Sequence, residues 1–290
     1  MPIRLSTPFA AAIAVAAIMV GAASASFAAD TPLERGKYLM SSVVACGNCH
    51  TPKGPNGKAI AGKELSGGDP IAAPVFRAMP GNITQDKETG IGNWTDEQII
   101  AAIREGKRPN GTIIGPPMPI PFYRGMSDTD VKAIVAYLRT VPAVSNKVEK
   151  STYKIPLPPS YGPPVIHVAD VPRADHVAYG KYLATGLGHC MDCHTPAVQG
   201  RADMTRMGAG GNPFGAPNGG VIISANLTPG NPNGVAGWTN QQVKDAITKG
   251  VRPDRPLVRL MAFDWYQNID SADLNDLVAF LRSLKPVKSQ

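Results

Sequence analysis

The sequence reads Cys-Gly-Asn-Cys-His at residues 46–50 and Cys-Met-Asp-Cys-His at residues 190–194, and these stretches use all four cysteines of the 290-residue chain. Two cysteines three positions apart on a helical turn can reach both vinyl groups of one haem, and the following histidine then lies under the iron. The pattern therefore predicts two covalently bound haem c groups. Their expected attachment residues and proximal ligands are Cys46, Cys49, His50, Cys190, Cys193 and His194.

Three other uses of paired cysteines fit this sequence less well. A zinc site made from two C-x-x-C pairs places them roughly 15–20 residues apart, whereas these pairs lie 144 residues apart. A disulfide in each pair would not explain why a histidine follows both. A thioredoxin-like redox site needs a βαβ context, which the sequence does not offer. Haem attachment accounts for both stretches.

The two motifs belong to a longer internal repeat with an offset of 144 residues, which becomes 143 after one residue is lost. The matching stretches include Gly-Lys-Tyr-Leu (36–39 and 180–183), Asn-Ile/Leu-Thr (82–84 and 226–228), Trp-Thr (94–95 and 238–239) and Arg-Pro (108–109 and 252–253). So many matches at a nearly constant offset indicate a tandem duplication.

A proline-rich segment separates the two copies, with seven prolines between positions 142 and 172. High proline density favours an extended, semi-rigid connection over a flexible tether. We therefore expect one domain at residues 30–145, a proline-rich linker at 146–175 and a second domain at 176–288.

Each copy contains three predicted helices. The first runs from about residue 33 into the haem motif and is repeated from about residue 177. The second opens with a Thr-x-x-Gln capping box, at 95–98 and again at 239–242. The third begins after Ser127 and carries apolar residues at i, i+3, i+4 and i+7, a spacing also found in the second copy. No segment alternates convincingly as a strand would, so we expect an all-α fold.

The first residues have the features of a secretory signal. Arg4 gives a positive start, residues 9–25 form an uncharged, alanine-rich run, and Ser26 and Ala28 place small side chains at the two positions that signal peptidase reads. We expect residues 1–28 to be a signal peptide, with a cut three residues earlier or an uncleaved anchor as alternatives. No later segment reaches the length of a membrane span. The mature chain is therefore expected in the periplasm without a transmembrane span, and peripheral membrane association stays open.

Both copies resemble class I cytochrome c domains. In the first copy the features that carry this resemblance are a helix with Gly36 and Tyr38, the C-x-x-C-H motif, a later methionine loop, and a final helix with Tyr137. The second copy repeats them, with Gly180 in its first helix and Phe280 in its last. The resemblance implies that the first and last helices of each copy cross at the glycine and the aromatic residue. It covers nearly all of the mature chain except the linker.

The short motifs Asn-Ile-Thr, Gly-Ile-Gly and Trp-Thr between residues 82 and 95 are also similar to those of cytochrome subunits of membrane-associated periplasmic dehydrogenases. Those subunits usually carry three such domains, whereas this chain carries two. The resemblance implies redox partners, namely a dehydrogenase donor and a cytochrome or oxidase acceptor.

A methionine in each copy is expected to complete the iron coordination. Met118 and Met261 match in the repeat, and an aromatic-Tyr pair follows each at the same distance. Met126 is a rival in the first copy, but its counterpart is Ile269. Prolines flank Met118 and do not flank Met261, so we expect the second loop to be more mobile. The predicted iron ligands are His50, Met118, His194 and Met261.

With methionine at both irons, the predicted chemistry is one-electron cycling of Fe(III) and Fe(II), without a catalytic residue. We expect an electron carrier, not an enzyme, between a dehydrogenase-type donor and a respiratory acceptor. The net charge of +7, or +6 without Arg4 of the expected signal peptide, suits acidic protein partners, and an exported protein has little access to nucleic acid. A peroxidase-like dihaem enzyme and a dedicated electron-transfer subunit of a dehydrogenase complex are the alternatives.

Overall fold

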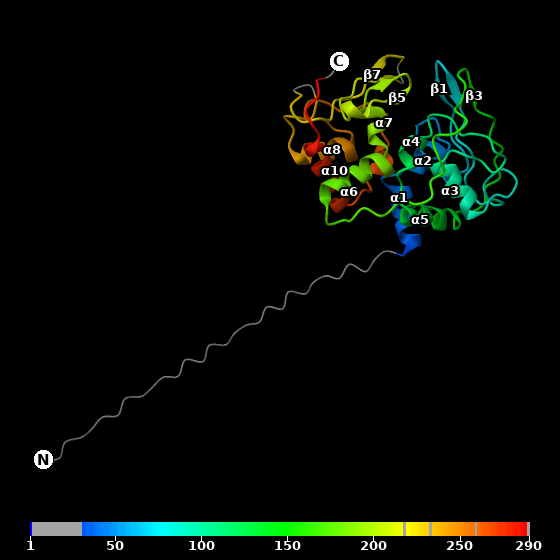
Figure 1. Ribbon diagram of the computed structural model, residues 1–290, viewed down its shortest axis with the longest axis horizontal. Helices are drawn as coiled ribbons and strands as arrows, with labels where there is room; N and C mark the ends of the chain where they lie inside the picture. The colour runs from blue at the N-terminus through cyan, green and yellow to red at the C-terminus, as the bar shows by residue number, and fades with distance from the viewer. Residues whose placement is uncertain (2–30, 217–218, 232–233, 259, 289–290) are drawn as a thin grey trace.

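The computed structural model describes Met1 and residues 31–216, 219–231, 234–258 and 260–288. The expected signal peptide thus lies, apart from Met1, outside the described residues. The two sequence repeats form neighbouring lobes, and helix α1 lies where the lobes meet (Figure 1). No helix in the described part of the chain combines the length and apolarity needed to cross a bilayer.

The first repeat contains the helices α1 (Pro32–Ser41), α2 (Cys46–His50), α3 (Asp96–Arg104), α4 (Ile120–Tyr123) and α5 (Asp128–Leu138). The predicted capping box at Thr95 and Gln98 is confirmed, with both reciprocal hydrogen bonds present. The expected continuous helix into the haem motif is wrong. α1 ends at Ser41, and Ala45 takes a left-handed conformation with φ of 53° before α2 begins.

The second repeat follows the same order, with α6 (His176–Tyr182), α7 (Cys190–His194), α8 (Asn240–Lys249), α9 (Phe263–Tyr266) and α10 (Ser271–Ser283). A π-helical turn, η1 (Leu183–Leu187), continues α6, and a short 3₁₀ helix, η2 (Met204–Arg206), follows α7. His189 repeats the left-handed conformation of Ala45, with φ of 42°. Both haem motifs therefore start from the same backbone turn.

The first and last helices of each repeat cross at a glycine. A Cβ on Gly36 would lie 1.9 Å from the carbonyl oxygen of Ala133 in α5 and 2.9 Å from Cβ of Tyr137. In the second repeat, a Cβ on Gly180 would lie 1.9 Å from the carbonyl oxygen of Asp276 and 2.9 Å from Cβ of Phe280. Only glycine allows the helix backbones to approach this closely. The crossing implied by the family resemblance is confirmed in both repeats.

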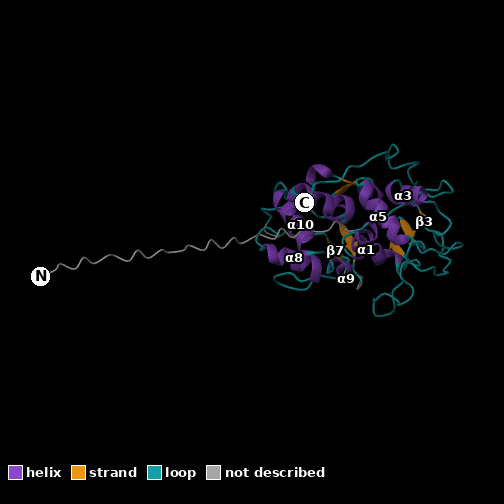
Figure 2. Ribbon diagram, turned by 90° about the horizontal axis from the view of Figure 1, so that it is seen from below, coloured by secondary structure: helices purple, strands orange, loops and turns teal. Residues whose placement is uncertain are grey.

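Short strands lie between the helices (Figure 2). They are β1 (Ile71–Ala73), β2 (Phe76–Ala78), β3 (Thr152–Tyr153), β4 (Ala197–Val198), β5 (Arg201–Ala202), β6 (Pro213–Gly215) and β7 (Val221–Ile223). All pairs are antiparallel, in the sheets β1-β2-β3, β4-β5 and β6-β7. The prediction of a mainly helical chain is confirmed, but the all-α expectation missed these strands because two or three residues are too few to show alternation.

The lobes bind each other through two reciprocal hydrogen bonds. Tyr38 in α1 donates its hydroxyl to Asp273 in α10 at 2.8 Å, and Tyr182 in α6 donates to Asp130 in α5 at 2.7 Å. Tyr38 and Tyr182 match in the repeat, as do Asp130 and Asp273. The interface is therefore pseudo-symmetric, because each repeat contributes the same donor and the same acceptor.

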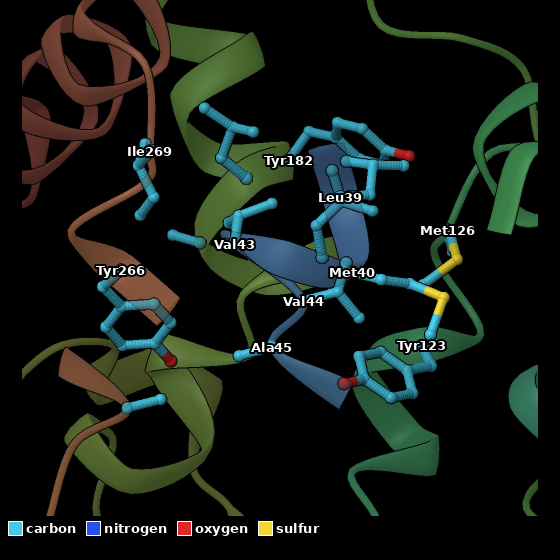
Figure 3. Packing of buried hydrophobic residues seen from close by; sticks show 14 of the residues in the cluster. Leu39, Met40, Val43, Val44, Ala45, Tyr123, Met126, Tyr182, Tyr266 and Ile269 are labelled. Carbon is cyan, nitrogen blue, oxygen red and sulfur yellow. The ribbon is translucent and has the colours of Figure 1, made fainter. Parts of the chain in front are cut away.

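An apolar core continues between the lobes around the chain that joins α1 to α2. Figure 3 shows Val44 and Ala45 between Tyr266 from α9 and Tyr123 from α4. These residues and Met126, which is 0% exposed, belong to one buried cluster that includes residues of both repeats. Its burial gives the paired lobes a shared hydrophobic contribution to stability.

The segment from 146 to 175 runs along the first repeat. Its strand β3 pairs with β2, and further along Val165 donates its backbone N–H to the Glu105 carboxylate at 2.9 Å. Near the end of this segment, the carbonyl of Val168 accepts the backbone N–H of Asp128, at the start of α5, at 3.0 Å. We call residues 146–175 the docked segment, because side-chain and backbone contacts attach it to the first repeat.

Candidate functional site

The histidines of the two motifs are held in the same way. Nδ1 of His50 lies 2.7 Å from the carbonyl oxygen of Gly81, and Nδ1 of His194 lies 2.9 Å from that of Ala225, the matching residue. A carbonyl can only accept, so each Nδ1 carries the proton and each Nε2 keeps a lone pair for a metal. Burial lowers the pKa of both histidines, which favours the neutral imidazole that binds iron.

The four cysteines lie on the short helices α2 and α7, and all are free thiols. The C-x-x-C spacing places both sulfurs of a pair near one another on one turn. Burial raises the pKa of Cys46 to about 12 and that of Cys190 to about 11, so these thiols are protonated at neutral pH. Such thiols can form thioether bonds without first breaking a disulfide.

The two predicted methionine ligands occupy matching places. Met118 directly precedes the turn into α4, where its carbonyl accepts the N–H of Ile120 at 2.8 Å. Met261 precedes α9, and its carbonyl accepts the N–H of Phe263 at 2.9 Å. Both side chains are half-buried against the core. The rival Met126 is fully buried between the lobes, a location that suits core packing.

A buried asparagine supports the histidine loop in each repeat. Asn82 accepts hydrogen bonds from the backbone N–H and hydroxyl of Thr84 and donates to the carbonyl of Val144 at 2.8 Å. Asn226 makes the same bonds with Thr228 and with the carbonyl of Val287, also at 2.8 Å. These asparagines directly follow Gly81 and Ala225, so they anchor the carbonyls that orient the histidines. This explains the repeated Asn-Ile/Leu-Thr pattern.

The chemistry of each donor set fits a covalently attached haem. It comprises two free thiols on one turn, a neutral imidazole with an available Nε2, and a thioether on a later loop. The residues that would hold the group are Cys46, Cys49, His50 and Met118 in the first repeat, and Cys190, Cys193, His194 and Met261 in the second. No group of three or more His, Cys, Asp or Glu side chains suited to a bare metal ion occurs among the described residues.

Aromatic residues link the two sites across the interface, a role that was not predicted from the sequence. Trp265 of the second repeat covers the first motif: a Cβ on Gly47 would lie 3.0 Å from its indole Nε1. In the reciprocal direction, the ring of Tyr123 meets the ring of His189 edge-on with centroids 5.8 Å apart. The sequence signal for this role was the aromatic-Tyr pair that follows each methionine. An internal repeat does not show, however, whether such a pair contacts its own copy or the other one.

Comparison with known proteins supports the same chemistry. The sequence model of the cytochrome c family matches residues 33–142. The chain is 30% identical to a dihaem cytochrome c-type protein of Cereibacter sphaeroides, over 72% of this chain and 70% of that protein. It is 32% identical to the cytochrome c subunit of the quinone alcohol dehydrogenase of Gluconobacter oxydans, over 83% of this chain and 52% of that protein.

A further relative is the cytochrome c subunit of gluconate 2-dehydrogenase of Pantoea cypripedii, 32% identical over 76% of this chain and 52% of that protein. The chain therefore spans about half the length of these dehydrogenase subunits.

Proposed function

Because the chain belongs to the cytochrome c family, whose members bind haem c covalently, we propose that it is a periplasmic dihaem cytochrome that transfers single electrons. Two tandem domains, residues 30–145 and 176–288, each hold one haem in this proposal, and residues 146–175 join them. Residues 1–28 would direct export.

The observation that carries the proposal is the duplicated support of the proximal histidine. Both histidines donate Nδ1–H to the carbonyl of matching residues, Gly81 and Ala225. A single functional copy would not require the second to keep this geometry together with both of its cysteines. We infer that both repeats hold a haem, rather than one active copy and one degenerate copy.

Bound haem supplies one-electron exchange between ferrous and ferric iron. The chain's part would be to bind and orient the haem: Cys46, Cys49, Cys190 and Cys193 would attach it, and His50 and His194 would offer Nε2 to the iron. Met118 and Met261 would each offer a thioether sulfur, a ligand that favours the reduced state. Because a histidine and a methionine would both hold each iron, electron transfer is favoured over peroxidase-like catalysis.

The similar proteins indicate the class of electron donor. Several similar proteins are cytochrome subunits of alcohol, gluconate or fructose dehydrogenases. A dehydrogenase-type donor is therefore the first choice, with a cytochrome or oxidase as the respiratory acceptor. The same similarity supports the second candidate, a subunit that stays bound to its dehydrogenase. Co-purification of the tagged chain with a dehydrogenase would distinguish that subunit from a free carrier.

A redox titration of the purified holoprotein, followed by absorbance, tests the proposal. Two one-electron transitions with methionine-ligated spectra are expected, together with two haems per chain. Met118→His and Met261→His, made singly, should each lower one potential because a second histidine stabilises ferric iron. An iron without a strong sixth ligand that turns over peroxide would instead favour the enzyme.

A further inference from the structure

The loops that carry the two methionines are built on the same turn. In the first repeat, Ile114 donates its backbone N–H to the carbonyl of Gly106 at 2.7 Å. In the second repeat, Leu257 donates to the carbonyl of Gly250, also at 2.7 Å. Ile114 and Leu257 match with the offset of 143 that also relates Met118 to Met261. The two loops therefore share their supporting turn and differ in the residues just before the methionine and in what surrounds them.

The docked segment holds the first loop with two tyrosine side chains. Tyr161 donates its hydroxyl to the carbonyl of Ile114 at 2.9 Å, and Tyr153 donates to the carbonyl of Pro116 at 3.0 Å. Both carbonyls lie within four residues of Met118. Tyr153 is itself fixed, because β3 pairs with β2 and its ring packs 6.1 Å from that of Phe76. The methionine loop is thus attached to a second, ordered piece of chain.

A glycine makes room for this attachment. A Cβ on Gly115 would lie 2.6 Å from Cζ of Tyr153 and 2.7 Å from Cδ2 of Leu157, both on the docked segment. The matching residue in the second repeat is Val258, which is 50% exposed. A valine at position 115 could not coexist with Tyr153 in its present place. The two sequences have therefore diverged at the position where the docked segment meets the loop.

The second loop is covered by its own repeat. A Cβ on Gly106 would meet the ring of Tyr161 at 2.9 Å, whereas a Cβ on Gly250 would meet the ring of Phe263 at 2.9 Å. Phe263 belongs to α9, directly after the methionine. Leu260, like Val258, is an exposed apolar residue of this loop, at 45%. The Met261 loop thus shows apolar side chains to water where the Met118 loop is packed.

We propose that the docked segment locks Met118 in place, whereas Met261 can be displaced by a small neutral or anionic lone-pair donor such as imidazole or cyanide. The second repeat is then the site at which an external ligand reaches the iron. This inference rests on the proposed function, because it assumes that both methionines are ligands. Displacement requires the loop to open locally, and each contact that must break lowers the population of the open state.

A titration of the oxidised holoprotein with imidazole tests this asymmetry. The charge-transfer absorption of methionine-ligated ferric haem reports how many irons keep their methionine. Half of this absorption, from the haem of the second repeat, should disappear at the lower imidazole concentrations. The other half should disappear at concentrations at least roughly tenfold higher, because two hydrogen bonds to the first loop must also break.

Gly115→Val places the second repeat's residue in the first loop and should displace Tyr153. The higher midpoint should then fall by roughly fivefold or more, while the lower midpoint stays constant. Val258→Gly is the matched control and should leave the higher midpoint unchanged. If Gly115→Val does not accumulate, Tyr153→Phe combined with Tyr161→Phe removes both hydrogen bonds with little change in shape and should produce the same shift.

Three results would overturn the proposal. If both halves disappear at one concentration, or if the Gly115 variant shifts only the lower midpoint, the docked segment does not govern exchange and the electron-carrier assignment stands. If ferric holoprotein shows no methionine absorption at all, the ligand assignment itself fails, and this inference with it.

Discussion

The Met118 loop and the Met261 loop start from the same duplicated sequence and end in different surroundings. The first accepts hydrogen bonds from Tyr153 and Tyr161 of the docked segment, while the second exposes Val258. Inside each repeat, by contrast, the histidine support and the helix crossing are nearly identical. The contacts that position a haem are therefore duplicated, and the contacts around the methionine are specific to each copy.

The interface aspartates show the same mixture of symmetry and divergence. Asp130 forms a paired salt bridge with Arg35, whose side chain is only 12% exposed. Asp273 forms a salt bridge with Arg173, whose side chain is 51% exposed. An unpaired guanidinium is costly only where water cannot reach it. The two halves of the interface should therefore respond unequally to the same substitution.

Asp130→Asn should have the largest effect, because it leaves the buried Arg35 without its counter-ion. We expect a loss of about 3–5 kcal/mol in unfolding free energy for Asp130→Asn. Asp273→Asn should cost about 1–2 kcal/mol, because Arg173 is hydrated and because burial raises the pKa of Asp273, which offsets part of the favourable contribution of its charge. Denaturant unfolding of both variants measures the difference. Equal losses would contradict the asymmetry of the interface.

Gly36→Ala and Gly180→Ala should cost similar amounts, about 3 kcal/mol each, because either Cβ would overlap a backbone carbonyl of the crossing helix. The free energy of unfolding from denaturant titration is the measurement. Gly81→Ala provides a control, since a Cβ at that position would have no atom of the described residues within 4 Å beyond its chain neighbours. A large loss in one repeat and none in the other would show that the crossings are not equivalent.

Asn82→Ala and Asn226→Ala should each destabilise the protein by about 2 kcal/mol, because the buried partner groups lose their hydrogen bonds. The anchored histidine loop should also loosen, which changes the spectrum of the haem in that repeat alone. Thermal melting and absorbance of the two variants show whether each substitution affects only its own repeat. A spectral change at both haems from one substitution would argue against separate sites.

Asp128→Ser should give the smallest effect, because the buried guanidinium of Arg104 keeps its two hydrogen bonds to the carbonyl of Met126, and this effect should depend on pH. Hydrogen bonds from Arg104 and His167 lower the pKa of Asp128 from 3.8 to about 2, so its ionised form stabilises the folded state above pH 3.8. That contribution disappears as the pH falls from 3.8 towards 2. The variant, which carries the residue found at the matching Ser271, should lose about 1 kcal/mol at pH 7 after allowance for solvent screening.

The difference between wild type and this variant should shrink as the pH falls from 3.8 to about 2, the folded-state pKa, and should disappear below it as Asp128 becomes protonated in the folded chain as well. Unfolding free energies measured from pH 7 to pH 2 test it. A difference that grows on acidification would have the wrong sign for a lowered pKa.

The repeat and its motifs allowed much of this architecture to be predicted. Gly36 and Gly180 marked the helix crossings, and the Thr-x-x-Gln boxes marked the starts of two helices, because each signal acts within a few residues. The strands were missed because β3 pairs with β2 across more than seventy residues and has no periodicity of its own.

The candidate sites were predictable only in part, because local sequence patterns do not reveal contacts between residues that are far apart in the chain. C-x-x-C-H identifies the attachment residues because one helical turn brings them together. The carbonyls of Gly81 and Ala225, and the tyrosines that hold the Met118 loop, act through backbone geometry and long-range packing. Such contacts leave no local pattern, although the change from Gly115 to Val258 was visible in the aligned repeats.

The central claim is that each repeat covalently binds one haem, and the intact mass of the denatured mature protein tests it most directly. The mass should exceed that of the polypeptide by two haems, and in the variant Cys190→Ala with Cys193→Ala by one. The first repeat keeps all of its own attachment residues in that variant. One haem on the native chain, or loss of both from the variant at an unchanged protein level, would contradict the account.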